Sequence, residues 1–152
     1  MSVRRSGGAA ACVAFAAGLG LVSCVGAGRS TATASYPALG VYISVRLTDD
    51  GGPAGVRRNV VLHRPKEAAV TLDLPVEPGP VSPVNLYGEP NRRLVLKDRR
   101  GVYALDVKAA RLDPMGDACA CGYGPFLGVF DHDERGAWRF IPSRDRPERK
   151  IE

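Results

Sequence analysis

The chain has 152 residues, a formal net charge of +5, a hydrophobic fraction of 45%, four cysteines and two histidines. This length supports one small domain, or two very small ones, with a single modest core. Its arginine pairs are interspersed with acidic residues, whereas nucleic-acid binders concentrate basic residues on one face and add stacking aromatics. We therefore exclude nucleic acid as the partner and interpret the charges as a solvated surface, with a mild attraction to anionic lipid or wall polymer as the alternative. The pairs are Arg57-Arg58, Arg92-Arg93 and Arg99-Arg100.

The first 24 residues have the pattern of an export signal. Arg4 and Arg5 precede the uncharged run 9–22, which at 14 residues is shorter than the roughly 20 that a spanning helix needs. The run ends in Leu21-Val22-Ser23-Cys24, which has two aliphatic residues, a small residue and a cysteine in order. This motif resembles the lipobox of bacterial lipoprotein precursors. The resemblance covers residues 1–24 only.

The lipoprotein resemblance implies an anchor on Cys24. In that family the cysteine thiolate takes a diacylglyceryl group, to which palmitate contributes, and cleavage falls between Ser23 and Cys24. The expected partner is therefore the lipid bilayer, and the expected location is the cell envelope, outside the cytoplasm. Some Gram-negative relatives carry a retention aspartate where this chain has Val25, so the outer membrane is favoured in a cell with two membranes. The alternative is an ordinary secretory signal that leaves Cys24 free or absent.

Composition divides the rest of the chain. A stretch rich in Gly, Ala, Ser and Thr predicts a flexible tether at 24–38, after a signal peptide at 1–23. A β-rich domain is expected at 39–142. The last segment, 143–152, is nearly all charged residues and proline and predicts a disordered tail.

Alternation of apolar and polar residues predicts β-strands. Val41, Ile43, Val45 and Leu47 alternate with polar neighbours and indicate a strand with one buried face. Turn residues separate further short candidates, and no helical period persists along the domain. The predicted strands are 41–47, 59–63, 69–74, 84–87, 94–97, 102–107, 126–130 and 137–141; the turns include 98–101, 113–116 and 133–136.

Four prolines in 75–83 divide the domain into two halves. Proline lacks a backbone donor, so this segment is predicted to run extended outside any central strand. We interpret it as a stiff crossover between groups of strands. A docking segment for a partner's aromatic groove is the alternative.

Two all-β architectures fit this pattern, a small sandwich and an SH3-like barrel. The strand 84–87 with its Pro-containing turn, and Gly136-Ala137-Trp138 in the closing strand, are similar to bacterial SH3-like domains. That similarity covers 84–141. The first half, 41–74, equally suits one sheet of an immunoglobulin-like sandwich, so the subtype is left open.

Cys119 and Cys121 are the most unusual local chemistry. If Cys24 carries lipid and Cys12 is removed, they are the remaining pair in an oxidising compartment, and we expect a small local disulfide. Such a short loop stabilises little. The alternatives are redox exchange, free thiols, or a zinc or copper site completed by His132.

The sequence lacks motifs for a catalytic serine, a metalloprotease or a phosphate-binding loop. His63 closes an apolar strand and is interpreted as an ordinary strand-end residue. We interpret Trp138 and the nearby aromatic residues as core, with an exposed contact patch as the alternative. The sequence therefore predicts a non-catalytic, membrane-anchored lipoprotein without a cofactor, whose β-rich domain interacts with envelope proteins or polymers. A Cys/His metal-binding or redox lipoprotein is the alternative.

Overall fold

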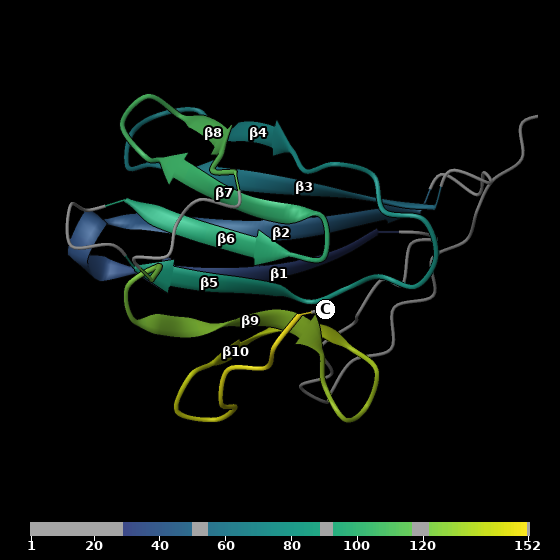
Figure 1. Ribbon diagram of the computed structural model, residues 1–152. Coiled ribbons are helices and arrows are strands. Elements are labelled where there is room, and N and C mark those ends of the chain that lie inside the picture. The colour runs from purple at the N-terminus through teal and green to yellow at the C-terminus, as the bar shows by residue number, and fades with distance from the viewer. Residues whose placement is uncertain (1–28, 50–54, 89–92, 117–121, 152) are drawn as a thin grey trace, which may run out of the picture.

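The computed structural model describes residues 29–49, 55–88, 93–116 and 122–151, which form two antiparallel sheets packed as a sandwich (Figure 1). The first sheet has the order β1-β2-β3-β4, with β1 at Arg29–Tyr36, β2 at Val41–Asp49, β3 at Val56–His63 and β4 at Val70–Asp73. The second has the order β10-β9-β5-β6-β7-β8, with β5 at Val84–Gly88, β6 at Leu94–Asp98, β7 at Gly101–Asp106, β8 at Arg111–Pro114, β9 at Phe126–His132 and β10 at Trp138–Pro142. A 3-10 helix, η1, at Pro37–Leu39 joins β1 to β2.

The predicted all-β class is confirmed, and the sandwich is the correct one of the two architectures. Within the described ranges the sheets stay as two layers and do not close into a barrel. The second sheet, β5 to β10, falls almost entirely within 84–141, and its inner face needs the first sheet to bury it. The SH3-like similarity therefore does not extend to the architecture of that half.

The core lies between the two sheets and follows the predicted alternation. Ile43 and Val45 of β2 are fully buried, as are Leu96 of β6 and Phe130 of β9. Trp138 is 6% exposed, and its Nε1 donates to the Val45 carbonyl oxygen at 3.0 Å, which links β10 to the middle of the first sheet. Burial of this apolar area is the main stabilising contribution.

Strand β1 corrects the predicted tether. Residues 29–36 pair with β2 in a continuous antiparallel register from Arg29 opposite Thr48 to Tyr36 opposite Val41. Ala32 and Ala34 point into the core, while Thr31, Thr33 and Ser35, which alternate with them, are exposed. Small residues suit this edge strand because β10 approaches it closely. Of the predicted tether, residues 24–28 lie outside the described residues, as does the predicted signal helix.

The edge strand β8 lies partly where a turn was predicted. Arg111–Pro114 pairs with β7, and Pro114 is opposite Tyr103. A proline is tolerated there because it ends a strand at the edge of a sheet. The remaining strands match their predictions to within a few residues.

The proline-rich segment 75–83 connects the two sheets and places the buried carboxylate of Glu77 between them. Glu77 is 3% exposed and Arg58 is 1% exposed, with Glu77 Oε2 and Arg58 Nη1 3.3 Å apart. Arg58 Nη2 also lies 2.8 Å from Asp98 Oδ2, although the two are not aligned for a hydrogen bond. Ser82 donates its backbone N–H and its hydroxyl to Glu77 Oε2, and its hydroxyl oxygen accepts from Arg58 Nη1. We call Arg58, Glu77, Ser82 and Asp98 the buried ion cluster.

The buried ion cluster corrects the interpretation of Arg58 as a surface charge. Arg58 occupies an inward position of β3, where its guanidinium joins the first sheet to the linker and to the end of β6. Buried charges require such partners, because an isolated ion is strongly penalised away from water. Asp98 is further held by backbone N–H groups of the β6–β7 turn, from Arg100 at 2.7 Å and Gly101 at 2.9 Å.

The C-terminal segment is ordered against the second sheet, which corrects the predicted disordered tail for residues 143–151. Arg146 pairs with Asp131 of β9 at 2.5 Å. Asn85 Nδ2 donates to the Arg149 carbonyl oxygen at 3.2 Å, and the Tyr87 hydroxyl donates to Glu148 at 2.7 Å. The segment covers Asn85 and Tyr87 on the outer face of β5 and supplies hydrogen-bond partners for their polar groups.

Tyr87 should make stability fall at alkaline pH. Burial, followed by the hydrogen bond to Glu148, raises the pKa of the Tyr87 phenol well above its usual value near 10. Above that usual value the unfolded chain has lost this proton while the folded chain keeps it, so the free energy of unfolding declines as pH rises. Tyr87→Phe should lower stability at pH 7 by about 1–2 kcal/mol and flatten this decline. Urea unfolding between pH 7 and 11 measures both effects.

The matched control is Tyr42→Phe, because the Tyr42 side chain is exposed on the first sheet. It should leave both the stability and its alkaline slope as in the parent. If the stability of Tyr87→Phe and that of the parent decline equally steeply at alkaline pH, the Tyr87 phenol is not the cause of the decline.

Among the described residues, no helix is long and apolar enough to cross a bilayer.

Candidate functional site

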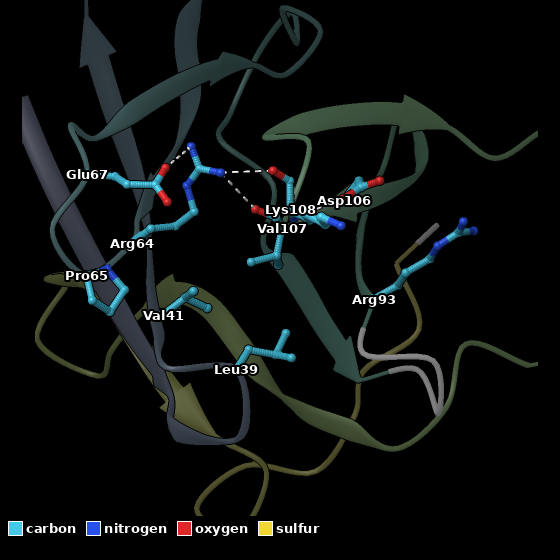
Figure 2. A pocket seen from close by; sticks show the side chains of 9 residues that line it. All are labelled: Leu39, Val41, Arg64, Pro65, Glu67, Arg93, Asp106, Val107 and Lys108. Atoms are coloured by element: carbon cyan, nitrogen blue, oxygen red, sulfur yellow. Dashed lines mark hydrogen bonds and ion pairs between the residues drawn. The ribbon is translucent and has the colours of Figure 1, made fainter.

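An open groove lies at one end of the sandwich, where turns of both sheets meet (Figure 2). It is bordered by η1, by the β3–β4 connection and by the turn after β7. Its volume is about 620 Å³, within the range typical of ligand sites. We call this the groove end; the opposite end, where β1 begins, is the β1-start end. The lining residues are Leu39, Val41, Arg64, Pro65, Glu67, Arg93, Asp106, Val107 and Lys108.

Arg64 spans the groove and ties the sheets together. It follows the last residue of β3, and its Nη1 donates to the Lys108 carbonyl oxygen at 2.9 Å and to that of Val107 at 3.5 Å. Its Nη2 pairs with Glu67 at 2.6 Å. Figure 2 shows the guanidinium between the Glu67 carboxylate and the two carbonyl groups. One planar guanidinium therefore fixes two groove walls that belong to different sheets.

Asp106 fixes the wall contributed by the turn after β7. Its Oδ1 accepts from the backbone N–H groups of Lys108 at 2.9 Å and Ala109 at 2.8 Å. The bond from Ala109 is the largest cause that lowers the pKa of Asp106 below its usual range, so the carboxylate is ionised at neutral pH. This arrangement holds Val107 against the groove and leaves the Lys108 side chain exposed.

The groove combines an apolar floor with a charged rim. Leu39, Val41 and Val107 supply the floor, and Figure 2 shows Arg93 away from the Arg64–Glu67 pair, at the other side of the opening. Among the described residues, the lining includes no hydroxyl, thiol or imidazole side chain, and both of its carboxylates have partners. Such a surface binds a ligand through apolar contact and charge.

A second shallow hollow lies on the outer face of the first sheet. Ser44 there has its Oγ 2.8 Å from Thr33 Oγ1 and 3.4 Å from His63 Nε2. Ser44 is 3% exposed, and no described carboxylate hydrogen-bonds to His63. A serine nucleophile requires access and an oriented base, so these contacts do not assemble one. His63 is at the end of β3, as predicted.

Of the predicted site residues, the structure describes only His132. Ser23, Cys24, Cys119 and Cys121 are outside the described residues. His132 is exposed at the end of β9, where its ring contacts Trp138 edge-on at 5.2 Å. No cluster of three or more His, Cys, Asp or Glu side chains in the described ranges has the geometry to hold a metal ion.

No sequence pattern predicts the groove. Its lining comes from four connections far apart in the chain, and each has the composition of an ordinary turn. The one local signal is Arg64-Pro65, because a residue before a proline is restricted to an extended backbone conformation. Its carbonyl partners carry no side-chain signature. No protein-family model, curated protein or solved structure matches this chain.

Proposed function

We propose that this chain is an exported lipoprotein of the cell envelope. A lipid on Cys24 anchors it, and a non-catalytic β-sandwich displays the groove to an envelope protein or polymer. The observation that carries the proposal is that β1 begins at the end of the sandwich opposite to η1 and the turn after β7 (Figure 1), which contribute residues to the groove. An anchor just before β1 would leave the groove accessible.

The lengths of the elements support this arrangement. Arg29 follows Cys24 by five residues, which span at most about 18 Å when extended. Strand β2 runs the length of the sandwich, and its nine residues correspond to about 30 Å. The five-residue connection is therefore shorter than the sandwich is long. It cannot let the anchored domain invert and set its groove end on the bilayer.

The groove lining supports binding rather than a reaction. Arg64 is occupied by Glu67 and two carbonyl groups, and Asp106 is occupied by backbone N–H groups. The exposed groups, Arg93 and Lys108, offer charge at the rim of an apolar floor. A partner with an apolar segment flanked by negative charge suits that surface.

Photo-crosslinking in the native host tests the groove. A benzophenone side chain at position 108 should form adducts with the partner, because it lies at the rim. A discrete shifted band would identify a protein, and a smear would identify a polymer. The matched control is the same group at position 139, where Arg139 is exposed in β10 outside the groove. Absence of adducts at 108, or equal adducts at both positions, would contradict the proposal.

A further inference from the structure

The β1-start end carries two turns that contain exposed arginines. The β6–β7 turn holds Arg99 and Arg100, and it lies at this end because Asp98 contacts Arg58 near the start of β3. The β9–β10 turn holds Arg135. It lies at the same end because β9 runs antiparallel to β5, with Phe130 opposite Val84.

The carboxylates beside these arginines are mostly occupied. Asp98 and Glu77 are buried with Arg58, and Glu77 also has a 3.5 Å contact with Arg99. In the second turn Asp133 pairs with Arg139 at 2.9 Å and accepts backbone N–H groups of its own turn.

Glu134 is the exposed carboxylate of the two turns, against exposed Arg99, Arg100 and Arg135. We call these three arginines the basic end patch. Asp98 fixes the first turn and Asp133 the second, so both turns present their arginines without first having to become ordered.

We propose that the basic end patch contacts anionic lipid headgroups. The contact sets the sandwich upright on the bilayer, with the groove facing outward. This inference rests on the proposed lipid anchor and adds the surface that orients the anchored domain.

Position and charge favour lipid over other anions. A five-residue connection from Cys24 would keep this end within about 18 Å of the bilayer, so headgroups would be present at high effective concentration. Basic residues near an anionic membrane each contribute on the order of 1 kcal/mol, and the attraction falls off within a Debye length of about 8–10 Å. The patch therefore assists an anchor and is too small to replace one.

Vesicle sedimentation of the processed chain tests the contact without the acyl groups. The chain starts at residue 24 with Cys24→Ser and retains every described strand, and circular dichroism checks the β-sheet signal of each variant. Its partition onto phosphatidylglycerol–phosphatidylcholine vesicles should exceed that onto phosphatidylcholine alone and should fall as salt rises. The double variant Arg100→Gln/Arg135→Gln should lower the partition by about thirtyfold. It leaves the Arg99–Glu77 contact in place.

The matched control is Arg93→Gln/Lys108→Gln, which removes the same charge from the groove end. It should retain most of the binding. Equal binding to both vesicle types would overturn the proposed contact with anionic headgroups. An equal loss of vesicle binding in the control would also overturn the role of the basic end patch. These outcomes are independent of lipidation, because loss of palmitate from the natural protein would overturn the anchor and leave the vesicle result unchanged.

Discussion

Arg58→Ala is expected to lower the free energy of unfolding by about 3–5 kcal/mol, enough to unfold a marginally stable domain. The guanidinium is 1% exposed and stands between Glu77 and Asp98, which are each 3% exposed. Alanine would leave two carboxylates in the interface of the sheets without their cation. Uncompensated buried charge, rather than lost packing, should therefore dominate the effect. Urea unfolding followed by circular dichroism at pH 7 measures it.

Two further variants separate the causes. Arg139→Ala removes an exposed arginine whose pair with Asp133 lies at the surface, and it should change stability by less than about 1 kcal/mol. Arg58→Met combined with Glu77→Gln and Asp98→Asn removes all three charges and should recover most of the loss. Recovery is expected because the cluster is incompletely bonded, with Arg58 Nε buried and without a hydrogen-bond partner. Equal losses in Arg58→Ala and Arg139→Ala would refute the role of the cluster.

Strands with branched apolar residues at period two were predictable. In β2 the alternation from Val41 to Leu47 specifies both the strand and its buried face. In β1 the inward residues are Ala32 and Ala34, and Thr and Ser alternate with them, which is also the composition of a linker. The pairing with β2, and not the local sequence, makes this segment a strand.

The polar interior was not predictable by the same means. Arg57 and Arg58 are adjacent and chemically identical, yet β-strand geometry sends one outward and the other into the core. Which of the two arginines can point into the core depends on Glu77 and Asp98, which are distant in sequence. The groove has the same property, because Arg64 bonds to carbonyl groups 43 and 44 residues away. The alternation of apolar and polar side chains identifies strands and their buried faces. The ion-pair and carbonyl partners of Arg58 and Arg64 can be identified only in the assembled fold.

The proposed anchor rests only on the sequence motif, and the fold changes what that motif implies. A tether of fifteen residues would have let the domain move freely above the bilayer. With β1 starting at Arg29, the connection to Cys24 is short, and any lipid there acts at one defined end of the sandwich. Orientation is therefore a property of the whole molecule and not of the signal alone.

Cys24→Ala is expected to abolish palmitate labelling in the native host and to prevent maturation to the processed mass. Two or three acyl chains, at about 0.8 kcal/mol per buried methylene, hold a protein firmly, whereas a protein without them has only weak surface attraction. The variant should appear as a soluble chain or as uncleaved precursor. Membrane fractionation with intact-mass measurement distinguishes these two. The matched control is Cys12→Ala, a cysteine that lies within the predicted signal peptide and is not the predicted lipid acceptor.

Cys12→Ala should label, mature and fractionate as the parent does, because only a cysteine directly after the cleavage position can form the thioether. If Cys24→Ala keeps its label and its mature mass, the lipid lies elsewhere. A parent protein that is soluble, unlabelled and cut near Ser23 would instead indicate an ordinary secretory signal. In that case the basic end patch would act without an anchor, and its weak attraction alone would not hold the domain at a bilayer at physiological salt.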